Sequence, residues 1–143
     1  MTCRGEPAAA PPAPVVSGIE RRAVLAALLV LACAGRVNAA AAAVDLTMTE
    51  YRFSPDRLLF RRGLPYRLVL ENRGAELHEF TAPEFLAAIA LDNPEALAPG
   101  GKEVVVRPGQ RAEPRFVALR PGRYAMSCAD HDWAGMVGEI IVA

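Results

Sequence analysis

Cys128-Ala129-Asp130-His131-Asp132-Trp133-Ala134-Gly135-Met136 is the most informative stretch of this 143-residue chain. It contains a thiol, an imidazole and a thioether in the spacing C-x2-H-x4-M. The residues on either side, 123–127 and 135–142, are rich in the residue types that form strands. A loop of this length between two strands can turn all three side chains toward one point. The stretch therefore predicts a compact group of metal-binding donors between two strands.

A fourth donor must come from elsewhere in the chain. The sequence has two histidines, so the second imidazole is His78, fifty residues before Cys128 on a predicted strand at 77–81. Two imidazoles and one thiolate with a weak thioether form the ligand set of blue-copper sites, since sulfur suits Cu(I) and imidazole tolerates Cu(II). We therefore predict one copper ion per chain, held by His78, Cys128, His131 and Met136.

Each of these residues also has an ordinary structural interpretation. A lone cysteine is often a small buried apolar residue, a lone histidine is often a hydrogen-bonded structural residue, and a methionine beside glycine is often part of the core. The combination favours a metal site, because a free thiol in an oxidising compartment is a liability unless it is buried or ligated. We interpret Met48 and Met126 as core residues, with Met126 on the same face as the thiol.

The segment 44–143 has the pattern of a single all-β domain. Pro65–Glu71 alternates Tyr66, Leu68 and Leu70 with more polar positions, which is typical of a strand with one face in a core. Seven or eight such strands, separated by short turns, indicate a Greek-key β-sandwich or barrel. The expected strands are 44–52, 57–60, 65–71, 77–81, 103–107, 111–119, 123–127 and 135–142. Residues 83–91 are the only helix-like segment, and 92–101 is a predicted loop.

Residues 1–43 have the composition of an export signal and an alanine-rich leader. Arg21 and Arg22 precede twelve uncharged residues, Ala23–Ala34. This stretch is too short to span a membrane but fits the apolar part of a signal peptide. We place cleavage near Ala39, by a general (Sec) or twin-arginine signal. A lipid anchor at Cys33 fits less well. The mature domain is then periplasmic or otherwise exported, without stable membrane insertion.

The charge balance argues against nucleic acid as a partner. Sixteen basic and sixteen acidic residues give a net charge of zero, whereas binding to phosphates needs a basic excess. From Val44 onward, twelve basic and fourteen acidic residues leave a net charge of −2. This value favours solubility and does not specify a partner.

Several motifs resemble those of the cupredoxin family, especially its small plastocyanin- and azurin-like blue copper proteins. They are Asn72-Arg73-Gly74, Leu77-His78-Glu79-Phe80, Pro121-Gly122-Arg123-Tyr124 and the run from Cys128 to Val142. The resemblance implies an eight-stranded Greek-key sandwich with copper at one end, held by His78, Cys128, His131 and Met136. It also implies a monomeric redox carrier that is not an enzyme. Redox partner proteins would form a transient interface at an exposed edge of His131.

Two features depart from the plastocyanin and azurin pattern. Glu79 stands where these proteins usually have asparagine, a residue that helps tie the two ligand loops together, so the resemblance leaves the reduction potential and the rigidity of the site open. Asp130 and Asp132 flank His131, where they are either solvated loop residues or an acidic face that favours a basic partner. Trp133 either packs over the site or belongs to a docking patch.

Three classes of function are consistent with these residues. The first is an exported type 1 copper protein that shuttles single electrons between redox partners. The second is a module for periplasmic copper delivery or storage, which would prefer Cu(I) and exchange it readily. The third is a cupredoxin-fold enzyme or a structural zinc domain. The single domain argues against an enzyme, and the scarcity of Cys and His argues against structural zinc.

Overall fold

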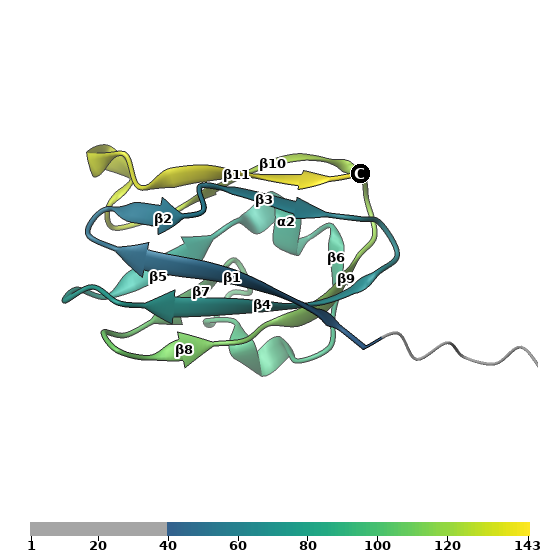
Figure 1. The fold of residues 1–143 in the computed structure, drawn as a ribbon, viewed down its shortest axis with the longest axis horizontal. Helices are drawn as coiled ribbons and strands as arrows, with labels where there is room; N and C mark the ends of the chain where they lie inside the picture. The colour runs from purple at the N-terminus through teal and green to yellow at the C-terminus, as the bar shows by residue number, and fades with distance from the viewer. Residues whose placement is uncertain (1–39) are drawn as a thin grey trace, which may run out of the picture. The chain divides into compact units, whose positions relative to one another are not determined.

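The computed structural model describes residues 40–143, which form two packed β-sheets (Figure 1). The predicted signal peptide, its cleavage near Ala39 and the anchor at Cys33 lie outside the described residues and stay predictions. Within residues 40–143, no helix has the length and apolar character needed to span a bilayer. The predicted all-β sandwich is confirmed, with eleven strands in the described part of the chain in place of seven or eight.

The first sheet has the order β2-β1-β4-β9-β6, and β8 also pairs with β4. Its strands are β1 (Ala42–Thr49), β2 (Arg52–Ser54), β4 (Pro65–Asn72), β6 (Ile89–Leu91), β8 (Arg111–Ala112) and β9 (Arg115–Ala118). β1 runs parallel to β4, with Leu46 opposite Leu70. The other pairs in this sheet are antiparallel.

The second sheet has the order β3-β11-β10-β5-β7. Its strands are β3 (Arg57–Phe60), β5 (His78–Thr81), β7 (Glu103–Val106), β10 (Gly122–Ser127) and β11 (Val137–Val142). β3 and β11 are parallel, and the remaining pairs are antiparallel. This sheet holds β5 beside β10, which brings His78 and Cys128 to the same end of the sandwich.

The core lies between the two sheets and follows the predicted alternation. In β4 the side chains of Tyr66, Leu68 and Leu70 are buried, while Arg67 between them is exposed. Met48 and Met126 are both fully buried, which confirms their interpretation as core residues. Burial of apolar area at roughly 25 cal/mol per Å² is the main force that holds the two sheets together.

Three predicted elements are wrong in their extent. The predicted strand 44–52 is divided into β1, which ends at Thr49, and β2, which begins at Arg52, by a turn at Glu50-Tyr51. The helix-like segment 83–91 is a single helical turn, α2 (Pro83–Leu86), followed by the strand β6, because Ile89–Leu91 pairs with β9. Proline at the first position suits that turn. The predicted strand 111–119 is divided into β8 and β9 at Glu113-Pro114, where proline has no N–H to donate to a ladder.

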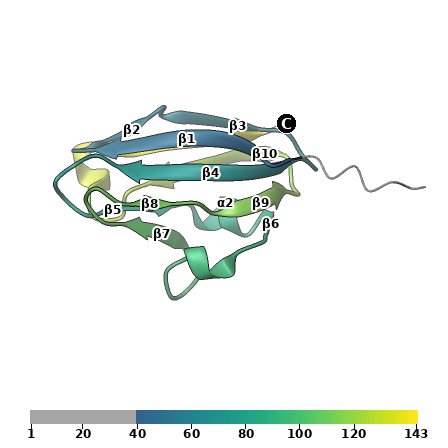
Figure 2. The same cartoon turned by 60° about the horizontal axis from the view of Figure 1, so that its bottom comes forward.

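The two ends of the sandwich differ in their loops. One end, at the left of Figure 1, carries residues 50–51, 73–77 and 128–136. The opposite end carries α2 and a cluster of aromatic rings that includes Phe60, Phe85 and Phe116. The predicted loop 92–101 contains a 3-10 turn, η2 (Pro94–Ala96), and projects from the edge between β6 and β7 (Figure 2).

Candidate metal centre

Strand β5 of the second sheet carries the first of the four predicted metal-binding residues, and the segment between β10 and β11 carries the other three. His78 is the first residue of β5, where it lies opposite Val106 of β7, and it is fully buried. Cys128 directly follows β10, which is joined to β5 by the pair Ser127 and Thr81. His131 and Met136 lie on the loop between β10 and β11, on either side of the 3-10 turn η3 (Asp132–Ala134).

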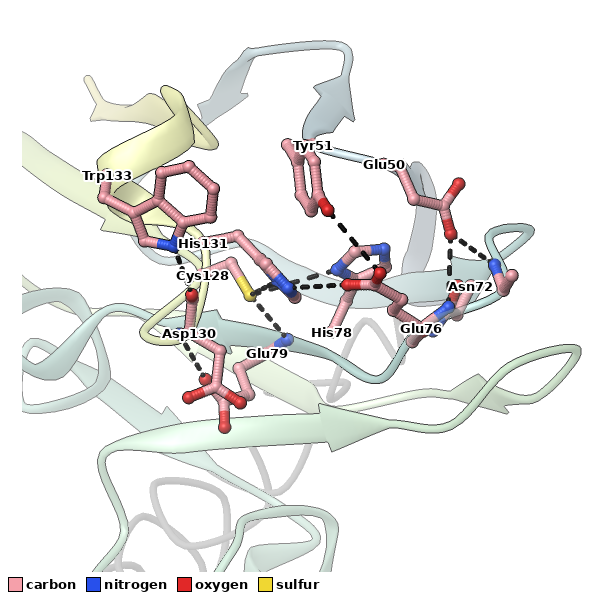
Figure 3. A network of polar contacts seen from close by, with 11 residues as sticks. Glu50, Tyr51, Asn72, Glu76, His78, Glu79, Cys128, Asp130, His131 and Trp133 are labelled. Carbon is pink, nitrogen blue, oxygen red and sulfur yellow. Dashed lines mark hydrogen bonds and ion pairs between the residues drawn. The ribbon is translucent and has the colours of Figure 1, made fainter.

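Three buried donor atoms converge at this end of the sandwich (Figure 3). The Sγ atom of Cys128 lies 3.3 Å from Nδ1 of His131 and 4.0 Å from Nδ1 of His78. The ligand atoms of the three residues all lie within 4.8 Å of one another. Two imidazole nitrogens and a thiol at these separations fit the donor set of a type 1 copper ion.

Backbone hydrogen bonds fold the loop so that Met136 lies against the same group. The N–H of Cys128 donates to the carbonyl of Met136 at 3.0 Å, and the N–H of Met136 donates to the carbonyl of His131 at 3.3 Å. Gly135, with φ of 86°, ends η3 in the left-handed region that glycine adopts readily. Met136 is fully buried, and its backbone is hydrogen-bonded to Cys128 and His131, so it lies close to the three converging donors.

His78 does not behave as an ordinary structural histidine. Its Nε2 is the one buried side-chain nitrogen or oxygen in residues 40–143 without a hydrogen-bond partner. Burial, and secondarily the neighbouring His131, lowers the pKa of His78, which favours the neutral form that binds metals. A buried unpaired imidazole nitrogen is costly, and hydrogen bonding within the protein gives no reason to keep it. Metal binding at Nδ1 gives such a reason.

Cys128 does not behave as a simple apolar residue either. Its Sγ accepts a hydrogen bond from the N–H of Glu79 at 3.4 Å and faces two imidazoles. Burial raises the pKa of the thiol, so the sulfur carries a proton at neutral pH while no metal is bound. A metal ion would displace that proton and be held by the thiolate.

Glu79 links the two segments that carry the donors. Its carboxylate accepts a hydrogen bond from the N–H of Asp130 at 3.2 Å, while its own N–H donates to Cys128. Burial, followed by the charge of Asp130, raises the pKa of Glu79. The departure from asparagine at this position therefore retains a connection between β5 and the loop, now made by a carboxylate.

The expectation that His131 exposes an edge to solvent is wrong. His131 is only 9% exposed. Its Nε2 lies 2.9 Å from a carboxylate oxygen of Glu76, and the ring of Tyr51 packs against its ring at 4.7 Å between centroids. Both residues come from turns at the same end of the sandwich, and no motif in the sequence singled them out.

The outer face of the loop is aromatic and acidic. Trp133 is 77% exposed, lies 5.9 Å from Tyr51 between ring centroids, and donates from Nε1 to the carbonyl of Asp130 at 2.9 Å. The side chains of Asp130 and Asp132 are exposed. Trp133 is therefore an exposed ring that packs against Tyr51, the residue that covers His131.

Comparison with protein families identifies the fold. The model of a family described as cupredoxin-like domain matches residues 22–142. The chain belongs to this cupredoxin family. This result confirms the resemblance found in the motifs around His78 and Cys128. Among curated proteins, no sequence matches the chain significantly.

Solved structures of other cupredoxins have the same fold. Dithionite-reduced auracyanin from the photosynthetic bacterium Roseiflexus castenholzii is 20% identical, with a TM-score of 0.55 over 73% of this chain and 98% of its own. Auracyanin B is 22% identical, with a TM-score of 0.54 over 72% and 89%. Auracyanin A, a "blue" copper protein from Chloroflexus aurantiacus, is 17% identical, with a TM-score of 0.52 over 71% and 98%.

Proposed function

We propose that this cupredoxin is a type 1 copper protein that carries single electrons between redox partner proteins. His78, Cys128 and His131 would hold one copper ion through Nδ1, Sγ and Nδ1, and Met136 would supply the weak axial thioether. When bound, copper supplies a reversible one-electron couple. The surrounding strands keep the four side chains in one arrangement for both oxidation states, which lowers the rearrangement needed for each transfer.

The convergence of three buried donor atoms within 4.8 Å carries this proposal. His78 reaches Cys128 only because β5 and β10 are neighbours in the second sheet. Isolated structural histidines and cysteines have no reason to meet inside a largely apolar core.

The closure of the site supports an electron carrier over a copper-delivery protein and over an enzyme. His78, Cys128 and Met136 are fully buried, and His131 is covered by Tyr51 and Glu76. A delivery protein must release its metal to an acceptor, and a catalytic metal keeps a position open for substrate. An electron can leave through a covering side chain, whereas a copper ion or a substrate cannot pass it.

We also propose that the partner contacts Tyr51 and Trp133, since the ring of Tyr51 covers His131 and the exposed ring of Trp133 packs against Tyr51. Asp130, Asp132 and Glu76 surround them with negative charge, which favours a basic partner. The rate of electron transfer to such a partner should fall as ionic strength rises.

Export of the domain is part of the proposal. Arg21, Arg22 and the apolar run 23–34 support a signal peptide, and cleavage near Ala39 would free the domain that begins at β1. N-terminal sequencing of the protein recovered from a periplasmic fraction tests this point directly.

The optical and EPR spectra of the Cu(II)-loaded domain test the proposed function. We expect an intense visible band from thiolate charge transfer and a small copper hyperfine splitting. In Cys128→Ser both features should disappear, while the conservative core substitution Met126→Leu should retain them. A wild-type protein that binds Cu(II) without visible colour would overturn the assignment.

A further inference from the structure

The two imidazoles of the site differ in what holds their outer nitrogens. Nε2 of His131 lies 2.9 Å from Oε2 of Glu76, while Nδ1 of the same ring lies 3.3 Å from Sγ of Cys128. Nε2 of His78 has no partner. A neutral imidazole has one N–H, and a carboxylate can only accept a hydrogen bond. The proton of His131 is therefore assigned to Nε2, which leaves the Nδ1 lone pair directed at the thiol and the metal site.

The backbone around Glu76 is held by two side chains. Glu50 accepts hydrogen bonds from the N–H groups of Ala75 and Glu76, the second at 3.1 Å. Asn72, fully buried, donates to the carbonyl of Glu76 at 2.8 Å. The hydrogen bonds that Glu50 accepts, above all the one from the N–H of Ala75, lower the pKa of Glu50. The turn 73–77 is thus fastened to the turn that carries Glu50 and Tyr51.

Gly74 allows this close approach of the two turns. A Cβ atom at position 74 would lie 2.4 Å from Oε1 of Glu50. Glycine is the residue that lets a carboxylate come this near to the backbone. The absence of a side chain at position 74 therefore permits the contact between the two turns.

Tyr51 covers the ring of His131, whose Nε2 is in contact with Glu76. Its ring lies 4.7 Å from the imidazole, and its hydroxyl lies 3.5 Å from Oε1 of Glu76 (Figure 3). The carboxylate of Glu76 is about half exposed, whereas the His131 side chain is 11% exposed. The contact between His131 and Glu76 thus lies at the rim of the site, with the imidazole inside and the carboxylate at the edge.

Building on the proposed copper site, we infer that Glu76 is a positioning residue for His131. Its carboxylate holds the proton on Nε2 and directs Nδ1 inward, and Tyr51 restricts the access of water to this contact. A carboxylate behind a metal-bound imidazole increases the basicity of the ligand, and removing such a partner typically weakens metal binding about 10-fold to 100-fold. Negative charge at this point also favours Cu(II) over Cu(I), so it lowers the reduction potential.

Two substitutions separate the charge of Glu76 from its hydrogen bond. Glu76→Gln retains an acceptor for Nε2–H and removes the charge, while Glu76→Ala removes both. At fixed pH we expect the reduction potential to rise in both variants. We expect Zn(II) affinity to fall about 10-fold to 100-fold in Glu76→Ala and less in Glu76→Gln. Glu95→Gln, a matched change on the exposed turn η2, should leave both quantities unchanged.

Proton NMR of the Zn(II)-loaded protein gives a readout that does not depend on copper. In the wild type the Nε2–H of His131 should exchange slowly with solvent, and in Glu76→Ala it should exchange rapidly. Tyr51→Phe keeps the ring and should produce only a small change. A wild-type domain without blue colour would count against the copper site. A blue wild type whose Glu76 variants match it in potential, Zn(II) affinity and Nε2–H exchange would overturn the role of Glu76 alone.

Discussion

The two ends of this sandwich bury different kinds of side chain. At one end Phe60, Tyr66, Phe85 and Phe116 pack ring against ring, with centroids 4.8 to 6.0 Å apart. At the other end the buried side chains include His78, His131, Cys128 and Asn72. The first group is apolar apart from the Tyr66 hydroxyl, which accepts a hydrogen bond from the N–H of Arg61. The second group is largely polar, and one of its atoms, Nε2 of His78, has no hydrogen-bond partner.

This difference indicates that stability and metal chemistry are located apart. Aromatic pairs contribute beyond the burial of their area, so the aromatic end supplies a surplus of stability. The donor end contains an imidazole nitrogen without a partner, which costs free energy in the metal-free protein. The stability of the aromatic end can therefore offset the free-energy cost at the donor end. Substitutions at the aromatic end should mainly change stability, and substitutions at the donor end should mainly change metal binding.

The largest expected effect on stability is at the aromatic end. Phe116 is 1% exposed and packs against the rings of Phe60, Tyr66 and Phe85, so Phe116→Ala should lower the free energy of unfolding by about 3–5 kcal/mol. Urea denaturation measures this loss. The molecules that remain folded should keep the visible spectrum of the copper-loaded domain. Trp133→Ala, which removes an exposed ring at the other end, should cost far less, and equal losses would remove the distinction between the ends.

The next effect has the opposite sign. His78→Leu removes the unpartnered Nε2 from the core and should raise the free energy of unfolding of the metal-free protein by about 1–3 kcal/mol. The same variant should lose the blue band. His131→Leu, which breaks a contact with Glu76, should instead lower metal-free stability by about 0.5–1.5 kcal/mol. Finding metal-free His78→Leu less stable than the wild type would show that His78 has a structural role.

A third prediction concerns the two buried methionines near the loop. Met136→Leu should keep the visible colour and raise the reduction potential, because a weak axial thioether tunes the potential of such sites. Met126→Leu, equally buried two residues before Cys128, should leave the potential unchanged. Cyclic voltammetry of both variants checks this, and a shift of equal size in both would assign the effect to packing.

The smallest effect is expected at a surface ion pair. Hydrogen bonds from Arg73 and Arg111 lower the pKa of the partly buried Glu71 below its ordinary value of 4.5. The stabilisation is then fully present above pH 4.5 and is lost as the pH falls through the lowered pKa. Glu71→Gln should therefore lower Tm slightly at about pH 7, and this difference in Tm should shrink as the pH falls below 4.5. A difference in Tm that grows at low pH would contradict this sign.

The sequence was sufficient to predict the fold class and to select four residues that the structure places close together. Cys128, His131 and Met136 are close in sequence and chemically distinctive, and His78 was the one imidazole left to join them. Alternation in Pro65–Glu71 predicted a strand with one buried face, as observed. These features depend on local spacing, which a sequence displays directly.

The cover of His131 could not be predicted in the same way. Glu50, Tyr51 and Glu76 lie in two turns that meet because β1 is parallel to β4 in the first sheet. Glutamate and tyrosine in turns are common, so their types indicate no function. The division of 83–91 into α2 and β6 likewise depended on the distant partner β9. In both cases a pairing between remote segments decided the outcome.

The parallel pairing of β3 with β11 has a consequence for the folding of this domain. It joins Arg57 to Glu139, across more than half of the chain. Domains whose contacts lie so far apart in sequence fold slowly, on the scale of milliseconds to seconds. The pairing of β5 with β10 also joins segments far apart in sequence. Before it forms, a metal ion meeting the chain would find only the three local donors of residues 128–136, and His78 would join them once β5 and β10 had paired.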